Sequence, residues 1–392
     1  MNIRLDPQVE KIIAVLEAHG HEAYAVGGCV RDSLLGRTPN DWDVTTSARP
    51  EEVKKLFRRT VDTGIRHGTV TVLFGKTGYE VTTYRIDGCY KDNRHPESVV
   101  FTDLLYEDLR RRDFTVNAMA YSRVRGLQDL FGGRKDLENG VIRAVGVPKE
   151  RFTEDALRIL RCVRFAAQLD FTVDEETLKA AEELSGNLKD ISKERIREEF
   201  VKTLMSGHPE YVGVLTKIGA VRFIEPTFPE REERAIALLT AAPADEVFRL
   251  AAFLYGAADP DAVLRDLRFD NKTRKAVVSM VRFADEPLSD EPRRLRHLMR
   301  DYGQEAFDDL LVFHGLVHGT DISGARKEAA GILERGECVS LSELAVTGED
   351  LKAQGVPAGR EMGRVLSALL ECVLDEPEFN KKEKLLLHIS KI

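Results

Sequence analysis

The sequence predicts an α/β domain with a small mixed sheet at the N-terminus, followed by a remainder that is helical throughout. Short apolar runs typical of strands, at Glu22–Val26, Thr69–Phe74 and Tyr79–Arg85, are confined to about the first 122 residues. From about Glu154 onward, helical periodicity dominates to the end of the chain. A chain of 392 residues with 43% hydrophobic residues can hold roughly two to four domains.

The first helix has clear end signals. Asp6 suits the N-cap, Pro7 suits the first turn, and Gly20 ends the apolar periodicity. A second helix is expected from Arg49 through about Phe57. The last two strands named above are joined by Gly75–Gly78, which predicts a hairpin.

Two glycines directly after the first strand point to a bound phosphate. Gly27 and Gly28 permit a tight turn and bring bare N–H groups close to a ligand. The segment Asp32–Gly36 is predicted to be a short helix whose N-terminus faces the same anion.

A pair of carboxylates follows this turn. Asp41, Asp43 and Thr45 alternate along a predicted strand, Asp41–Thr46, so both carboxylates project from one face. Mg²⁺ takes one or two protein oxygens together with substrate phosphates, so the pair predicts a Mg²⁺ site for phosphoryl transfer. The structural alternative is an Asp-rich loop after a glycine turn.

Together, the glycine turn and the carboxylate pair resemble the nucleotidyltransferase superfamily that includes DNA polymerase beta. Within it they resemble the class II tRNA nucleotidyltransferases (CCA-adding enzymes) and the bacterial poly(A) polymerases. The resemblance implies four parts: a polymerase-beta-like catalytic head at 1–122, a helical neck at 123–205, a helical body at 206–290 and a helical, tRNA-binding tail at 291–392.

The resemblance also implies roles for the first motif. Asp41 and Asp43 would be catalytic and would hold two Mg²⁺ ions. Gly28 and Arg31 would hold the triphosphate, with Gly27 supporting the turn.

Three further segments of the head resemble the family. Glu80 matches a third carboxylate that helps to activate the attacking hydroxyl, with an exposed strand glutamate as the alternative. Thr63–Thr71 resembles a segment typical of the CCA-adding branch. Asp87–Pro96 resembles the family's flexible loop, which this branch needs for the final A addition and which CC-adding relatives lack.

The segment Arg111–Ala118 matches the family's RRDFTxNA motif at every fixed position. Clustered guanidiniums suit triphosphate or ribose contacts because each offers a planar fork of donors, so Arg112 is expected to bind nucleotide with Arg111 in support. Asp113 and Asn117 fall four residues apart on one face of a predicted helix, which suits contacts to a sugar edge. A charged helix start is the alternative.

A helix beginning at Glu154 is expected to carry the base readers. Asp155 and Arg158 recur at helical spacing, and a carboxylate with a guanidinium can pair with the edge of a base. The resemblance implies that these two residues select CTP or ATP, that Glu154 holds Arg158, and that Arg161 and Arg164 line the nucleotide site. The alternative is an amphipathic helix with a surface ion pair, worth a few tenths of a kcal/mol.

The segment Ser192–Phe200 resembles the last shared motif, which braces the base-reading helix. Ser192 suits a helix cap, and Arg195 lies one turn on.

Charge and cysteine content bound the partners and the compartment. The net charge is −8, yet Arg110–Arg164 holds 13 Lys/Arg against 7 Asp/Glu, which suits local capture of a polyanion. Five scattered cysteines without a CxxC pair indicate neither a zinc site nor a disulfide framework. No stretch of 18 apolar residues and no apolar signal region is present, so a cytoplasmic protein without membrane contact is expected.

These features predict a CCA-adding enzyme that extends the 3′ acceptor end of tRNA from CTP and ATP and releases pyrophosphate. A poly(A) polymerase would carry a basic G-R/K-R/K-F segment where Gly64–Thr69 stands here. An enzyme that adds only A stays open, and a non-catalytic RNA-binding module is the alternative from another class. The oligomeric state is left open, with a homodimer as one option.

Overall fold

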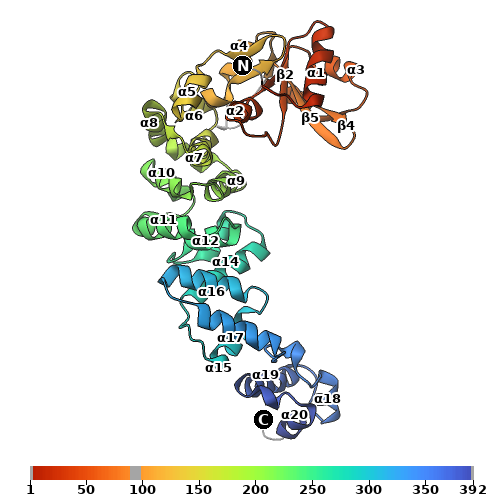
Figure 1. The fold of residues 1–392 in the computed structure, drawn as a ribbon, viewed down its shortest axis with the longest axis vertical. Helices are drawn as coiled ribbons and strands as arrows, with labels where there is room; N and C mark the ends of the chain where they lie inside the picture. Colours follow the sequence, from red (N-terminus) through yellow and green to blue (C-terminus); the bar gives the residue numbers. More distant parts are fainter. Residues whose placement is uncertain (1–2, 89–98, 390–392) are drawn as a thin grey trace. The chain divides into compact units, whose positions relative to one another are not determined.

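The structure is a computed structural model that describes residues 3–88 and 99–389 (Figure 1). The chain forms two compact units. Unit 1 comprises Met1–Thr240 with Ala262–Arg268, and unit 2 comprises Ala241–Asp261 with Phe269–Ile392. Every described residue to which the sequence assigns catalysis or nucleotide binding lies in unit 1.

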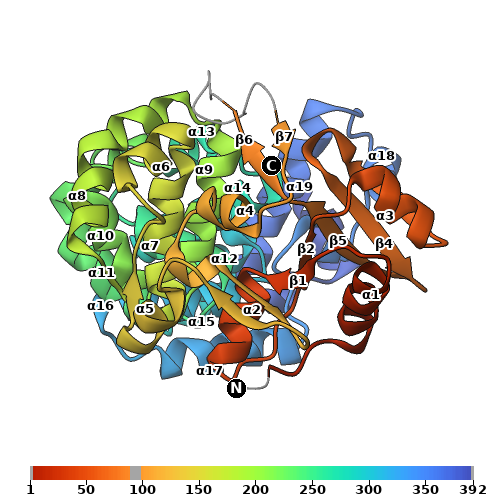
Figure 2. The same ribbon diagram turned by 90° about the horizontal axis from the view of Figure 1, so that it is seen from above.

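A seven-stranded mixed sheet forms the N-terminal part of unit 1 (Figures 1 and 2). Its strands are β1 (Ala23–Val26), β2 (Asp43–Thr46), β3 (Thr60–Gly64), β4 (Thr69–Phe74), β5 (Thr77–Thr83), β8 (Met119–Ser122) and β9 (Gly126–Asp129). They lie in the order β3-β4-β5-β2-β1-β8-β9, with β2 and β5 parallel and the other neighbours antiparallel. Two short ladders lie outside this sheet: β6 (Arg85–Asp87) with β7 (Val99–Phe101), and β10 (Val141–Ile142) with β11 (Thr172–Val173).

Helices cover the sheet where its strands are most apolar. All four residues of β1 are buried, and α1 (Pro7–Ala18) packs on β1 and β2 through Val9, Ile12 and Leu16. The Asp6 carboxylate accepts hydrogen bonds from the N–H groups of the first turn, as expected of the N-cap. The helix α3 (Pro50–Leu56) has Arg49, the expected start, as its N-cap residue, and it packs on β4 and β5.

Several element bounds in the head differ from the sequence prediction. The helix α2 (Gly28–Leu34) begins four residues before Asp32, β2 begins at Asp43 instead of Asp41, and the hairpin strand β5 spans Thr77–Thr83. The sheet also continues past residue 122, because β9 completes it. The neck, body and tail ranges stay expectations.

Helices make up most of the rest of unit 1, which confirms the predicted α/β-then-α order. These helices are α4 (Leu105–Arg110), α5 (Gly133–Asn139), α6 (Pro148–Glu154), α7 (Leu157–Leu169), α8 (Glu175–Leu184), α9 (Lys193–Leu204), α10 (Val212–Lys217), α11 (Glu232–Ala241) and most of α13 (Pro260–Asp266). The apolar side of α7, which includes Leu160 and Val163, is buried, and α7 packs against α9.

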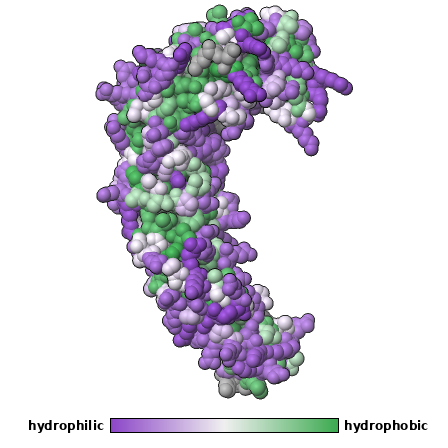
Figure 3. Space-filling model, viewed as in Figure 1, coloured by the Kyte–Doolittle hydropathy of each residue, from purple (hydrophilic) through white to green (hydrophobic). Residues whose placement is uncertain are grey.

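Unit 2 is built from helices throughout its described part. They are α12 (Glu246–Leu254), α14 (Asn271–Ala284), α15 (Pro292–Tyr302), α16 (Phe307–His318), α17 (Ser323–Glu334), α18 (Gly348–Ala353), α19 (Arg360–Asp375) and α20 (Lys382–His388). Fully buried aromatic rings, Phe253, Phe283, Phe307 and Phe313, hold α12, α14 and α16 together. Hydrophilic side chains predominate on the face of α15 to α20 that Figure 3 shows.

The structure bears on two expectations, one about membrane contact and one about the cysteines. Within residues 3–88 and 99–389, no helix has both the length and the apolar character needed to cross a membrane. The four described cysteines, Cys29, Cys162, Cys338 and Cys372, are free thiols.

Candidate active site

The glycine turn lies directly against the arginine motif. Gly27 has φ of +83°, a conformation that favours glycine, and it caps α2. A Cβ placed on Gly27 would lie 3.0 Å from Nη1 of Arg112. Gly28 is the first residue of α2, and Arg31 lies one turn further along the same helix. The turn therefore needs glycine both for its backbone and for the approach of Arg112.

The structure brings together the three predicted carboxylates. Asp43 opens β2 and pairs in register with Glu80 on the parallel strand β5, while Asp41 precedes the strand by two residues. Loss of hydration raises the pKa of Asp43, Arg112 opposes this shift, and Asp41 adds to it. Loss of hydration also raises the pKa of Glu80, and the charges of Asp43 and Asp41 add to that shift. The three carboxylates are thus close enough to repel one another.

The donor chemistry of this group fits Mg²⁺. Among the described residues, no cluster of three or more His, Cys, Asp or Glu side chains has the geometry of a finished metal site. The carboxylates of Asp41 and Asp43 are nevertheless the hard oxygen ligands that Mg²⁺ takes in one or two copies. Their crowding, with Glu80 beside them, is relieved by a divalent cation, so the residues present fit the ion.

Asp108 anchors the arginine motif, and the sequence reasoning missed it. This carboxylate is fully buried on α4 and accepts hydrogen bonds from Arg111, at 3.0 Å from Nε and 2.7 Å from Nη2. It also lies 3.5 Å from Nη2 of Arg112 and accepts a 3.0 Å hydrogen bond from the Thr45 hydroxyl on β2. Burial alone would raise the pKa of Asp108, but Arg111 and Arg112 hold it below its ordinary value. The sequence did contain one sign of this role, because Arg111 and Arg112 follow Asp108 by three and four residues.

The helix predicted through Asp113 and Asn117 is wrong. The helix α4 ends at Arg110, the chain turns, and Thr115–Asn117 forms a single 3₁₀ turn. The two side chains still meet, because Nδ2 of Asn117 donates to Oδ1 of Asp113 at 3.2 Å. Asn117 Oδ1 in turn accepts from Nη1 of Arg31 at 2.7 Å, and Asp113 Oδ2 accepts from Nη2 of Arg161 at 2.6 Å.

This chain of contacts joins the head to α7. Asp113 is buried, and burial would raise its pKa, but Arg161 and then Arg158 lower it to about 2. Asp113 is therefore ionised at neutral pH and, together with Asn117, links the glycine-turn helix α2 to α7.

Three guanidiniums gather around the ring of Phe165. The guanidinium carbons of Arg31 and Arg161 each lie 5.2 Å from the ring centroid, and that of Arg164 lies 4.0 Å from it. Nε of Arg164 pairs with the buried Glu199 of α9 at 2.8 Å, a partner that the sequence reasoning missed.

The charges of this cluster repel one another. Burial lowers the pKa of Arg164 to about 10; Glu199 opposes the shift, and the charges of Arg161 and Arg31 add to it. Cations held close enough to repel one another favour a bound polyanion such as a triphosphate.

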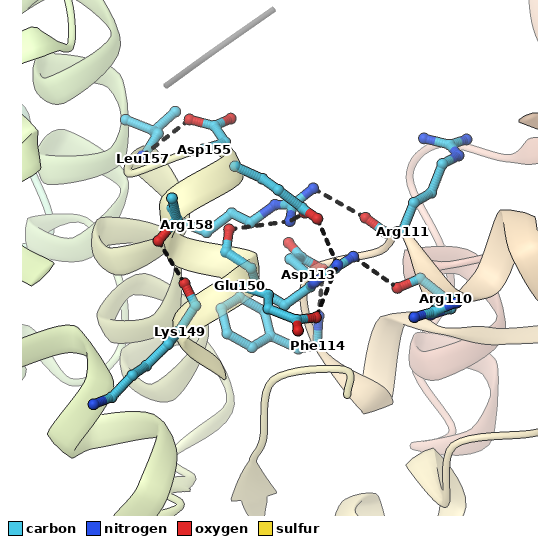
Figure 4. Close-up of polar contacts among 12 residues, drawn as sticks. Arg110, Arg111, Asp113, Phe114, Lys149, Glu150, Asp155, Leu157 and Arg158 are labelled. Atoms are coloured by element: carbon cyan, nitrogen blue, oxygen red, sulfur yellow. Dashed lines mark hydrogen bonds and ion pairs between the residues drawn. The ribbon is translucent and has the colours of Figure 1, made fainter. Parts of the chain in front are cut away.

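The single helix predicted from Glu154 is interrupted. Glu154 ends α6, Asp155 has extended backbone, and α7 begins at Leu157. The expected contact between Glu154 and Arg158 is confirmed, because Nη1 of Arg158 donates to Oε2 of Glu154 at 2.7 Å. Figure 4 shows Arg158 reaching toward the backbone of Arg111, whose carbonyl oxygen accepts from Nη2 of Arg158 at 2.9 Å.

The side chain of Asp155 is held by an arginine of α9. Nη2 of Arg195, on α9, donates to Oδ2 of Asp155 at 2.9 Å, and the Leu157 N–H donates to Oδ1 at 3.0 Å. The expected bracing by the Ser192–Phe200 segment is thus confirmed at Arg195. Ser192 occupies the N-cap position of α9 without a side-chain capping bond. Of the predicted loop Asp87–Pro96, residues 89–96 lie outside the described residues.

Comparison with known proteins identifies related sequences along the whole chain. The family model described as "Poly A polymerase head domain" matches residues 23–143. The model described as "Probable RNA and SrmB- binding site of polymerase A" matches residues 170–230, and a model of tRNA nucleotidyltransferase domain 2 matches residues 245–389.

Individual proteins match over nearly their full length. The CCA-adding enzyme of Lactiplantibacillus plantarum is 40% identical over 388 residues, which cover 96% of this chain and 93% of the relative. The crystal structure of the Bacillus stearothermophilus CCA-adding enzyme in complex with CTP has 31% identity and a TM-score of 0.82, covering 99% of this chain and 98% of that one. The Thermotoga maritima CCA-adding enzyme complexed with tRNA_CCA shares the fold, at 22% identity and a TM-score of 0.67, with 99% and 96% of the two chains covered.

Proposed function

This chain belongs to the family of CCA-adding enzymes, the tRNA nucleotidyltransferases, and from that premise we propose that it adds C, C and A to the 3′ end of tRNA. The substrates are CTP and ATP, and pyrophosphate is released. The observation that carries the proposal is the meeting of the Asp41, Asp43 and Glu80 carboxylates with Arg112, beside the turn of Gly27 and Gly28.

Asp41 and Asp43 are the proposed holders of Mg²⁺, which when bound lowers the pKa of the attacking hydroxyl and stabilises the pyrophosphate leaving group. Glu80, whose pKa is raised, is the proposed acceptor of the proton of the tRNA 3′ hydroxyl. Arg112 and the Phe165 cluster of Arg31, Arg161 and Arg164 neutralise the triphosphate. Gly28 brings backbone N–H groups to the same anion.

Base selection is assigned to Asp155 and Arg158. Arg195 fixes the carboxylate of Asp155, and Glu154 together with the Arg111 carbonyl fixes the guanidinium of Arg158. A guanidinium has five N–H donors, so a fixed Arg158 can keep some bonds to the protein while others face a base edge. A fixed donor and acceptor pair can distinguish C and A from U and G by their hydrogen-bonding edges.

The proposed partner is the 3′ acceptor end of tRNA, and the proposed compartment is the cytoplasm, where tRNA is processed. The basic segment Arg110–Arg164 supports binding of the acceptor stem.

Omitting one nucleotide at a time tests this function. Purified protein with tRNA lacking its CCA end should add two residues from CTP alone, none from ATP alone, and three from both. A single A added only to tRNA that already ends in CC would indicate an A-adding enzyme, and a long ladder from ATP alone would indicate a poly(A) polymerase. Binding of tRNA without any extension would indicate a non-catalytic RNA-binding module and would contradict the proposal.

A further inference from the structure

Arg151 shares the carboxylate of Glu154 with Arg158. Nη2 of Arg151 pairs with Oε1 of Glu154 at 2.5 Å, and Nη1 of Arg158 pairs with Oε2 at 2.7 Å. Each oxygen of Glu154 is therefore held by a different guanidinium. The side chain of Arg151 is buried on α6, with 10% of its surface exposed.

The guanidiniums of Arg151 and Arg158 also donate hydrogen bonds to the carbonyl oxygens of two consecutive residues. Nη1 of Arg151 donates to the carbonyl oxygen of Arg110 at 3.0 Å, and Nη2 of Arg158 donates to that of Arg111 at 2.9 Å. Figure 4 shows these two carbonyl groups on the segment that faces Arg158. The same segment continues into Arg112, whose charge acts on Asp43. A short path of two hydrogen bonds and the backbone of residues 110–112 therefore joins α6 to Arg112, whose charge acts on the carboxylate site.

This arrangement restricts Glu154 more than one ion pair could. A carboxylate that accepts a charge-assisted bond on each oxygen cannot rotate without breaking one of them. Without Arg151, the Glu154 side chain would pair with Arg158 alone, as a single ion pair with freedom to change rotamer. The orientation of Arg158 would then depend on its bond to the Arg111 carbonyl, without a fixed Glu154 carboxylate on the other side.

We propose that Arg151 is a positioning residue for nucleotide selection: it locks Glu154 and, through Glu154, the guanidinium that reads the base. This inference rests on the proposed function, in which Arg158 reads the base. Arg151 itself touches no substrate in this account. Its loss should therefore impair discrimination among nucleotides more than it impairs the reaction of the correct one.

The test measures kcat and KM for CTP, UTP and GTP on tRNA lacking CCA, with products resolved at single-nucleotide length. The variants are Arg151→Ala, Arg151→Lys and Arg158→Ala. Arg134→Ala is the matched control, because Arg134 makes an i,i+4 pair with Glu138 on the exposed surface of the same unit. Thermal midpoints of all variants are recorded beside the kinetics.

Arg151→Ala should lower the preference for CTP over UTP by about tenfold or more, the size expected for one lost orienting contact. Arg151→Lys should restore part of the preference, because it keeps the charge but cannot hold Glu154 and the Arg110 carbonyl with one planar fork. Arg134→Ala should keep wild-type selectivity.

Two outcomes would overturn the inference: unchanged selectivity in both Arg151 variants, or an equal loss for every nucleotide that follows the thermal midpoint. Arg151→Lys decides the matter if Arg151→Ala does not fold. If selectivity were relaxed in Arg158→Ala but not in the Arg151 variants, only the proposed role of Arg151 would be refuted. Wild-type selectivity in Arg158→Ala would instead refute base reading by Arg158 itself.

Discussion

Asp43 on β2 and Glu80 on β5 are register partners across the parallel contact between their strands. Both carboxyls have raised pKa values, chiefly because the surrounding protein removes hydration, and Asp41 raises both further. An acid with a raised pKa in the folded state binds its proton more tightly there than in the unfolded chain. These carboxylates therefore cost folding stability once they are ionised, and they supply the concentrated negative charge that a divalent cation needs.

Replacing Asp43 by asparagine should raise the thermal midpoint at pH 7 in the absence of metal. The raised pKa of Asp43 means that its destabilising effect is present above the folded-state pKa and disappears as pH falls below the ordinary carboxyl value of about 4. The gain in Asp43→Asn should therefore shrink in acid. Asp103→Asn, which alters an exposed carboxylate paired with Arg49, is the control. A lower midpoint for Asp43→Asn at pH 7 would contradict the reading of this site.

Added Mg²⁺ should stabilise the wild-type protein and should do so less in the variants Asp41→Asn and Asp43→Asn. A ligand at 100 times its Kd adds about 2.7 kcal/mol to the unfolding free energy. The measurement is the thermal midpoint as a function of MgCl₂ without nucleotide or tRNA, which makes it independent of activity. An equal shift in wild type and both variants would place the ion elsewhere.

Asp108→Asn should destabilise unit 1 strongly. The substitution leaves Arg111 and Arg112 without their buried counter-charge, and breaking such a pair by removing one partner costs about 3 kcal/mol or more. The lowered pKa of Asp108 gives the sign with pH: its stabilisation is present above the unfolded-state pKa and is lost as pH falls through the folded-state value. The measurement is urea denaturation of Asp108→Asn and of the control Asp103→Asn at pH 7. Equal denaturation midpoints in the two variants would contradict the role of Asp108 as the anchor of the arginine motif.

Local signals in the sequence predicted elements well, whereas contacts between distant segments were beyond it. The cap at Asp6 and the start of α3 at Arg49 depend on neighbours within one turn, and both are as expected. The break at Asp155 was missed because the helical spacing of charged residues continues through it without a glycine or proline. Its physical cause includes Arg195, which lies 40 residues away in sequence and holds the Asp155 carboxylate outside a helix.

The candidate site shows the same division. Motif matching identified the three clustered carboxylates and most of the arginines of the site, because residue type and spacing along the chain were enough to predict their chemistry. It could not identify Glu199, whose pairing with Arg164 depends on how α7 packs on α9. The strand β9 was missed because Gly126–Asp129 lacks a run of β-branched or aromatic residues and pairs only through its hairpin with β8.

Phe165→Leu should raise KM for CTP and ATP alike, by roughly tenfold, with little change in kcat. The ring aligns Arg31, Arg161 and Arg164, and each guanidinium over an aromatic face contributes about 0.5–2 kcal/mol that leucine cannot replace. The nucleotide preference should stay intact, because the guanidiniums that stack on this ring are those of Arg31, Arg161 and Arg164 and not that of the base reader Arg158. Steady-state kinetics with each nucleotide checks this. If KM rose for only one of the two nucleotides, the result would indicate that the Phe165 cluster reads the base instead of binding the triphosphate.

The most direct test of the account is single-turnover addition of CMP to tRNA lacking CCA, by the wild type and by Asp41→Ala and Asp43→Ala in excess Mg²⁺. The wild type should extend the tRNA, and each variant should be slower by on the order of 10³-fold or more, because an alanine methyl cannot hold the metal. Both variants should remain folded in unit 1, as judged by a cooperative thermal transition of the whole protein. Near-normal addition by either folded variant would contradict the assignment of catalysis to this carboxylate pair.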